Sequence, residues 1–154
     1  MQKYRKAVFV VVYSRTKKRI EYLLLKRKLH WKGWEFTKGG IEKGEKEEQA
    51  VKRELMEETG RKAAAIKKFN FYGRYRYRRI FPSRPGMIGQ TYSLFAAEVK
   101  KAMARLDERE HSAYAWLPYE KASRLLRWKD QRKSLRIVDS WLMHGRKKQK
   151  GKKN

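Results

Sequence analysis

Apolar, β-branched residues gather in short runs that predict strands. The first run, residues 7–13, reads Ala-Val-Phe-Val-Val-Val-Tyr, and the second, residues 21–26, contains three consecutive leucines. Continuous apolar runs of this length are typical of strands that are buried on both faces. Further strand-like stretches occupy residues 66–81, 90–100 and 113–117, and a short strand is expected near 37–41 in an otherwise irregular segment.

Helix-forming residues fill most of the remaining chain. Residues 46–59 contain neither Gly nor Pro, and Gly60 stands where a C-terminal cap is expected. Val51 and Leu55 lie one helical turn apart and provide an apolar strip for docking on a sheet. After Pro118 the pattern predicts two more helices, over residues 119–126 and 130–143. Strands and helices in this order predict an α/β fold in which helices cover both faces of a mixed sheet.

The length of 154 residues fits one domain, which we expect to span residues 1–145. Residues 146–154 are rich in lysine and are predicted to be a basic, disordered tail. The absence of cysteine excludes disulfides and thiolate metal sites. No apolar run is long enough to span a bilayer, and no signal cleavage site is visible, so we expect a soluble cytoplasmic protein without a membrane partner. The sequence leaves the oligomeric state open.

The formal net charge of +26 results from 42 Lys and Arg against 16 Asp and Glu. Such a surface attracts polyanions, which include RNA, DNA and polyphosphorylated nucleotides. An organism whose proteins are generally basic is the alternative explanation for this charge. The acids are concentrated, because seven of the 16 fall between residues 42 and 58: Glu42, Glu45, Glu47, Glu48, Glu54, Glu57 and Glu58.

Three of these acids share one helical face. Glu54, Glu57 and Glu58 have the i, i+3 and i+4 spacing that brings side chains together, and three like charges within one turn repel one another. A hard divalent cation, Mg²⁺ or Mn²⁺, would remove this repulsion because such ions prefer oxygen ligands. An ordinary solvated helix with many charges is the alternative. Upstream, Gly39-Gly40 would allow the backbone to approach a metal or a phosphate closely.

The stretch 39–60 resembles the Nudix box. That motif consists of Gly, five residues, Glu, seven residues, Arg-Glu, an aliphatic residue, any residue, Glu-Glu, any residue and Gly. The matching positions here are Gly39, Glu45, Arg53, Glu54, Leu55, Glu57, Glu58 and Gly60. One position departs from the family, since Arg61 follows where an aliphatic residue is usual. We expect Ala63 or Ala64 to supply the missing contact with the core.

The resemblance implies a Nudix-type α/β/α sandwich and a Mg²⁺- or Mn²⁺-dependent hydrolase of phosphoanhydride bonds. It implies metal ligation by the Gly39 carbonyl, Glu54, Glu57 and Glu58, with Glu54 as the alternative general base. Arg53 and Glu45 look like the pair that holds the loop against the helix. Glu110 matches a further catalytic carboxylate of the diadenosine tetraphosphate hydrolase group, although a solvent-facing loop residue is the alternative.

Several residues outside the box are candidates for substrate binding. The segment around Trp34 and Lys38 resembles the Trp-x-Phe-Pro-Lys-Gly segment of diadenosine polyphosphate hydrolases, and RNA 5′-pyrophosphohydrolases carry a related one. Lys38 would contact a phosphate. Tyr75 and Tyr77 share one face of a strand and would stack on a base, or they would pack in the core. Trp34, likewise, would either stack on a base or pack in the core. Arg27 would face the phosphates or lie in solvent.

Three functions follow from these residues. The first is asymmetric hydrolysis of diadenosine tetraphosphate, or of a related nucleoside polyphosphate, to ATP and AMP. The second is the removal of pyrophosphate from RNA 5′ ends, which the high positive charge favours. The third is a non-catalytic RNA-binding module, against which the intact acidic cluster speaks. Under each of them the basic surface and tail are candidate RNA contacts.

Overall fold

The computed structural model describes residues 3–152, and it describes side chains for residues 3–145. Within this range seven strands and three helices follow one another: β1 (Lys3–Arg15), β2 (Ile20–Arg27), β3 (Gly33–Glu35), β4 (Thr37–Gly40), α1 (Glu47–Thr59), β5 (Ala65–Arg76), β6 (Met87–Glu98), β7 (His111–Leu117), α2 (Tyr119–Leu125) and α3 (Lys129–Lys152). Among the described helices, none combines the length and the apolar character needed to cross a membrane.

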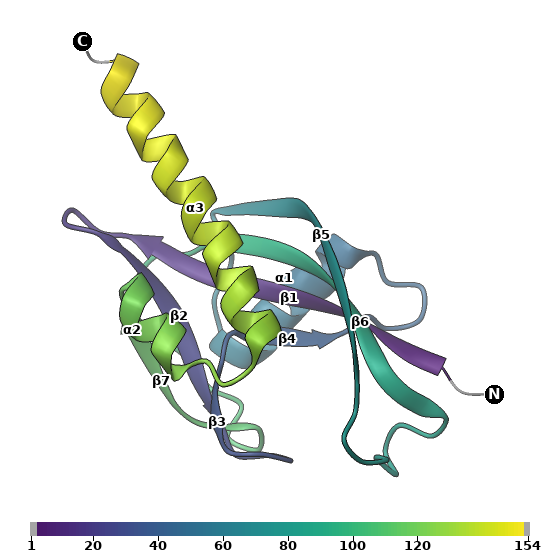
Figure 1. Cartoon of the computed structure of the whole chain (residues 1–154). Coiled ribbons are helices and arrows are strands. Elements are labelled where there is room, and N and C mark those ends of the chain that lie inside the picture. Colours follow the sequence, from purple (N-terminus) through teal and green to yellow (C-terminus); the bar gives the residue numbers. More distant parts are fainter. Residues whose placement is uncertain (1–2, 153–154) are drawn as a thin grey trace.

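The strands form one mixed sheet in the order β3-β2-β1-β6-β5 (Figure 1). β1 and β6 run parallel from the pair Lys3–Met87 to the pair Tyr13–Glu98, whereas the other pairs are antiparallel. Along its other edge β1 pairs first with β4 and then with β2, and β7 pairs with β2. β1 is therefore the central strand, which explains why its apolar run is continuous.

Alternate residues of β1 enter two separate cores. Phe9 and Val11 belong to the core that also contains residues of α2 and α3, whereas Val8 and Val10 belong to the core beneath α1. Period-two alternation sends neighbouring side chains to opposite faces of a sheet, so both faces must be covered. Figure 1 shows α1 behind the sheet and α3 in front of it. The predicted α/β/α sandwich is confirmed.

Helix α1 begins and ends as its sequence predicts. Lys46 has extended backbone angles at the N-cap, and Gly60 adopts the left-handed conformation (φ 70°, ψ 19°) while its N–H donates to the Met56 carbonyl at 2.9 Å. Leu55 is completely buried in the core under the helix. Ala63 packs against the same core and Ala64 is exposed, so Ala63 supplies the contact that Arg61 cannot make.

The structure differs from the predicted elements in three places. The segment expected to be an irregular loop contains β3, whose three residues are too few to show a periodicity. The strand predicted for 66–81 ends at Arg76, because the chain then turns through Pro82 and the Arg84 N–H donates to the Phe81 carbonyl. The last helix runs past Met143 to Lys152, so its backbone includes most of the predicted tail 146–154. Side chains of residues 146–152 and all of residues 153–154 lie outside the described part, and disorder there stays a prediction.

Candidate active site

Arg53 connects three segments of the chain. From α1, its Nε and Nη2 donate to the two carboxylate oxygens of Glu45 at 2.8 and 2.9 Å, and Nη2 also donates to the Gly40 carbonyl at 2.8 Å. The hydrogen bonds that Glu45 accepts from Arg53 and from the Glu42 N–H lower the pKa of Glu45 to about 2. The loop before α1 and the end of β4 are thereby fixed to the helix, and the contact expected between Arg53 and Glu45 is present.

The three clustered carboxylates differ in their environment. Glu54 and Glu58 are buried, whereas Glu57 is exposed. Arg53 Nη1 donates to Glu54 at 2.7 Å and to Glu57 at 3.3 Å, but Glu58 Oε2 is buried without a hydrogen-bond partner. Burial raises the pKa of Glu54 to about 7 against the opposing effect of Arg53. Burial, together with the negative charges of its neighbours, raises the pKa of Glu58 well above its usual value.

Gly39 lies directly against the Glu54 carboxylate. A Cβ atom at position 39 would overlap the carboxylate group, so only glycine allows β4 and α1 to approach this closely. Gly39 pairs with Val8 of the central strand, which fixes its position in the sheet. Backbone atoms of β4 therefore border the acidic cluster.

The donor set fits a hard divalent cation. Buried carboxylates with raised pKa values and an unpartnered oxygen on Glu58 indicate negative charge that the surrounding side chains do not neutralise. In the described part of the chain, no three His, Cys, Asp or Glu side chains converge at metal-binding distance. Arg53 Nη1 instead bridges Glu54 and Glu57. The residues that would hold the ion are Gly39, through its carbonyl, Glu54, Glu57 and Glu58.

A second charged cluster lies buried beside the first, around Glu35. The Glu35 side chain is completely buried, and its carboxylate contacts Arg27 Nη1 at 3.0 Å, His111 Nε2 at 2.8 Å and Lys38 Nζ at 3.7 Å. Burial alone would raise the pKa of Glu35, but Lys38, the hydrogen bond with His111 and the charge of Arg27 lower it to about 2. A role for Glu35 was not predicted from the sequence. Its one signal is an acid between two large aromatic residues, Trp34 and Phe36.

This cluster changes the interpretation of two predicted substrate ligands. Arg27 is buried and also donates from Nε to the Leu29 carbonyl at 2.7 Å, so its guanidinium is already engaged. The Lys38 side chain is only 15% exposed and lies next to Glu35. Both cations compensate the buried Glu35 carboxylate, and neither projects freely toward solvent. Their predicted contacts with phosphates stay predictions.

Glu110 lies near the acidic cluster. It directly precedes β7, and His111, the first residue of β7, pairs with Arg27 of β2. The negative charge of Glu110 contributes to the raised pKa values of Glu54 and Glu58. The fold therefore places Glu110 close enough for its charge to act on the helix carboxylates, and its catalytic role stays a prediction.

Aromatic and cationic side chains gather on the other side of β4. The rings of Tyr75 and Tyr77 meet edge to face at 6.1 Å, and Arg84 lies over the Tyr77 ring at 5.5 Å and donates to its hydroxyl at 3.1 Å. A Cβ atom on Gly40 would collide with the Arg5 guanidinium. Burial and the charge of Arg84 lower the pKa of Arg5. Among the described residues, neither arginine has an ion-pair partner.

The two tyrosines predicted to stack on a base are half-buried, and the neighbouring Arg5 and Arg84 were not predicted from the sequence. Tyr75 also packs against the core beneath α3, so its two predicted alternatives, base stacking and core packing, are not exclusive. Trp34 packs against the same core and pairs with Leu126. We call Arg5, Tyr75, Tyr77 and Arg84 the arginine–tyrosine cluster.

Comparison with known proteins agrees with this architecture. The family model of the NUDIX domain matches residues 3–138. An RNA pyrophosphohydrolase of Nitratiruptor sp. is 33% identical over 125 residues, which cover 77% of this chain and 81% of the relative. The asymmetrical bis(5′-nucleosyl)-tetraphosphatase of Mus musculus is 31% identical over 118 residues, which cover 75% of this chain and 76% of the relative.

Solved structures show the same fold. A C. elegans Ap4A hydrolase in a binary complex superimposes with a TM-score of 0.73 at 23% identity, covering 91% of this chain and 98% of the other. A Nudix hydrolase structure from Listeria monocytogenes superimposes with a TM-score of 0.77 at 22% identity, covering 94% and 97%. The family model spans most of the chain, and both curated relatives are named as hydrolases. The chain belongs to the Nudix family and is a Nudix hydrolase.

Proposed function

We propose that this pyrophosphohydrolase cleaves a dinucleoside polyphosphate asymmetrically, with diadenosine tetraphosphate giving ATP and AMP. The observation that carries the proposal is the arginine–tyrosine cluster next to Glu54. The charge of Glu54 contributes to the pKa of Arg5, so the cluster and the acidic site adjoin. Two guanidinium groups that have no ion-pair partner among the described residues lie beside two tyrosine rings, which matches a ligand with several phosphates and an aromatic base.

Under this proposal some residues bind the substrate and another accepts a proton. A divalent cation bound by the carboxylates would neutralise the phosphate oxygens and lower the pKa of a water molecule. Arg5 and Arg84 would bind the phosphates that the cation leaves free, and Tyr77 would stack on a base. Glu54, whose pKa of about 7 lies near neutral pH, is suited to accept the proton of the attacking water. The oxygen of that water bonds to phosphorus, and the anhydride P–O bond on the other side breaks.

The direct test is incubation of the protein with diadenosine tetraphosphate and Mg²⁺, followed by separation of the products by chromatography. We expect ATP and AMP in equal amounts, and no release of two ADP molecules. Arg84→Gln should raise KM by about tenfold or more, because a charge-assisted phosphate contact is lost. Arg124→Gln, an exposed arginine on α2, is the matched control. No turnover of the dinucleotide beside rapid turnover of 5′-triphosphorylated RNA would reject the proposal.

A second candidate function is the removal of pyrophosphate from RNA 5′ ends. The net charge of +26 favours it, and the Nitratiruptor relative is named for this activity. Lys38 was the residue that favoured a dinucleotide substrate, and its ion pair with Glu35 leaves it less available to a phosphate. This function predicts that pyrophosphate leaves 5′-triphosphorylated RNA and that KM for the RNA rises steeply with salt, whereas KM for a dinucleotide changes less.

A further inference from the structure

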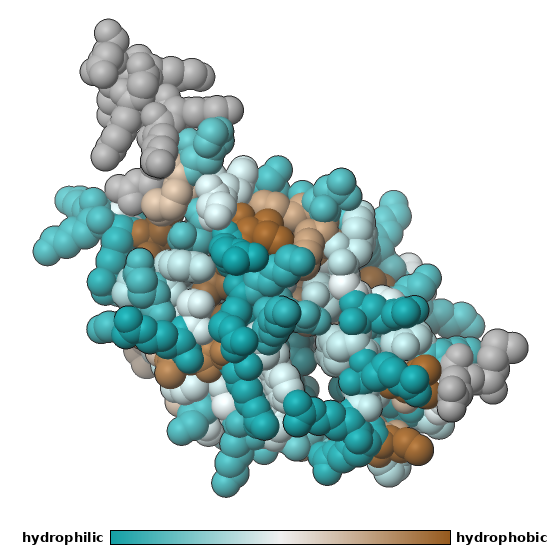
Figure 2. Space-filling model, viewed as in Figure 1, coloured by the Kyte–Doolittle hydropathy of each residue, from teal (hydrophilic) through white to brown (hydrophobic). Residues whose placement is uncertain are grey.

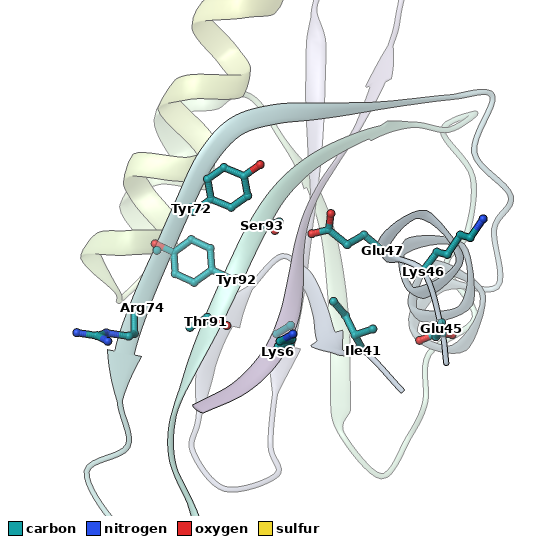
Figure 3. Close-up of a pocket in the computed structure, with 12 residues that line it drawn as sticks. Lys6, Ile41, Glu45, Lys46, Glu47, Tyr72, Arg74, Thr91, Tyr92 and Ser93 are labelled. Carbon is teal, nitrogen blue, oxygen red and sulfur yellow. The ribbon is translucent and has the colours of Figure 1, made fainter. Parts of the chain in front are cut away.

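A groove separate from the arginine–tyrosine cluster lies on the α1 side of the sheet. It has a volume of about 850 Å³. Figure 3 shows that it lies between the start of α1 and the adjoining ends of β1, β6 and β5. Its lining includes Lys6, Ile41, Lys46, Tyr72, Arg74 and Thr91. A volume of this size lies within the range typical of small-molecule sites and is large enough for a nucleotide.

The cations of the groove form a row across three strands. Lys6 of β1 and Arg74 of β5 both pair with Thr91 of β6, so they flank it on the same face of the sheet. Two strand spacings separate them, which corresponds to about 10 Å. Both side chains are exposed, and in the described part of the chain neither has an ion-pair partner. This row leaves two positive charges available to an external anion.

The acids of the groove are already neutralised. Glu45 accepts hydrogen bonds from Arg53 at 2.8 and 2.9 Å. Glu47 accepts one from Lys68 at 2.6 Å. Burial alone would raise the pKa of Glu47, but Lys68 and Ser93 lower it. The uncompensated charge on the groove is therefore positive.

An aromatic ring lies beside this row. Tyr72 stands two residues before Arg74 in β5 and pairs with Ser93, so it occupies the same face of the sheet. Its side chain is exposed at 58%, which is unusual for a large ring in a strand. Exposed rings next to unpaired cations are the combination by which proteins bind single-stranded nucleic acid, because bases stack while phosphates meet the cations.

We propose that this groove binds single-stranded RNA, with a base stacked on Tyr72 and backbone phosphates at Lys6 and Arg74. The site is distinct from the acidic cluster, although Glu45 joins the two through Arg53. It goes beyond the proposed hydrolysis, because RNA bound here would be held whether or not its 5′ end is a substrate. The high positive charge would bring RNA to the surface, and the groove would retain it.

The test uses the full chain with EDTA and a ten-nucleotide, 5′-hydroxyl RNA, whose binding is followed by fluorescence anisotropy. The double variant Lys6→Gln/Arg74→Gln should weaken binding about tenfold or more. It should also reduce the slope of log Kd against log salt by about 1.4, the value for two lost phosphate contacts on a single strand. The charge-matched control is Lys17→Gln/Lys18→Gln, in the exposed turn about 30 Å away at the other end of β1. It should change Kd by less than about twofold.

Tyr72→Ala, which leaves the charge unchanged, should weaken RNA binding at least about fivefold, and Tyr72→Phe should restore it. Equal losses in the groove variant and its control would overturn the proposal in favour of diffuse attraction. Inorganic polyphosphate that competes equally well with RNA, together with an unchanged Kd in Tyr72→Ala, would overturn it in favour of a simple anion site. Turnover of diadenosine tetraphosphate with Mg²⁺ should be unaffected by these substitutions, so failure of either proposal is distinguishable from failure of the other.

Discussion

Arg27 and Glu35 form an ion pair inside the protein, in which Nη1 of Arg27 lies 3.0 Å from Oε2 of Glu35. The Glu35 side chain is completely shielded from solvent, and His111 and Lys38 compensate the same carboxylate. β2, β3, β4 and the start of β7 each contribute one member of this cluster. The pair therefore connects the segments that surround the acidic site.

Glu35→Gln should destabilise the protein by about 3 to 5 kcal/mol, because the buried Arg27 and the partly buried Lys38 would lose their counter-charge. Urea denaturation measures the free energy of unfolding. Glu48→Gln is the matched control, since its ion pair with Lys52 is exposed on α1, and it should cost less than about 0.5 kcal/mol. A cost for Glu35→Gln no larger than that of the control would show that this cluster does not stabilise the fold.

Glu57→Gln should reduce kcat by about 10²-fold or more while changing stability by less than about 0.5 kcal/mol. Glu57 is exposed, and its one described contact is with Arg53 at 3.3 Å, so the fold does not depend on it. Titration calorimetry with Mn²⁺ should show weaker binding in parallel. If Glu57→Gln retained wild-type turnover, Glu57 would not be a metal ligand.

Without metal, stability should fall as the pH rises from about 4.5 to 7. The pKa of Glu54 is about 7 in the folded protein against 4.5 in the unfolded chain, so the folded state binds more protons between these values. Glu58, whose pKa is also raised, acts in the same direction. The shift of Glu54 alone corresponds to a loss on the order of 3 kcal/mol.

Thermal denaturation in EDTA at pH 5.5 and pH 8 measures this dependence. Mg²⁺ at saturation should abolish or reverse it, because the cation binds the ionised carboxylates and stabilises the folded state most at the higher pH. The lowered pKa values of Glu35 and Glu45 contribute only below about pH 4.5 and do not affect this comparison. A metal-free protein that is equally stable at both values would contradict the burial of charge described here.

Gly39→Ala should abolish turnover and destabilise the fold by more than 1 kcal/mol, because the added methyl group would overlap the Glu54 carboxylate. Gly145→Ala is the control within α3, where nothing lies within 4 Å of an added Cβ. It should leave turnover unchanged and stabilise the protein by up to about 1 kcal/mol through helix propensity. Circular dichroism and turnover of the two variants would be compared directly.

Elements with a strong local signal could be predicted from the sequence. The apolar run of β1 predicts a buried strand. The uninterrupted helix formers of α1, followed by Gly60, predict a helix and its end. β3 could not be predicted, because Gly33–Glu35 becomes a strand only by pairing with Leu25–Arg27. The end of β5 depends likewise on the turn that follows Arg76.

In the candidate site, too, local features could be predicted from the sequence and tertiary contacts could not. The spacing of the acids on α1 is a local property, so the sequence reveals it. The Glu35 cluster depends on tertiary contacts, since His111 and Glu35 are 76 positions apart in the chain. Arg5 and Arg84, likewise, meet only because β1 and the segment before β6 are brought together, and a surface rich in arginine gives no sign of which two will be neighbours.

The contacts of Arg53 have a consequence for how the protein acquires its metal. Because Arg53 Nη1 bridges Glu54 and Glu57, it reduces the repulsion between these carboxylates when no cation is bound. A cation held by these carboxylates would displace Nη1, whereas Nε and Nη2 could still donate to Glu45 and Gly40. Binding of the ion would thus require the rearrangement of a side chain and not the unfolding of the loop. The position of the loop before α1 would therefore not depend on the cation.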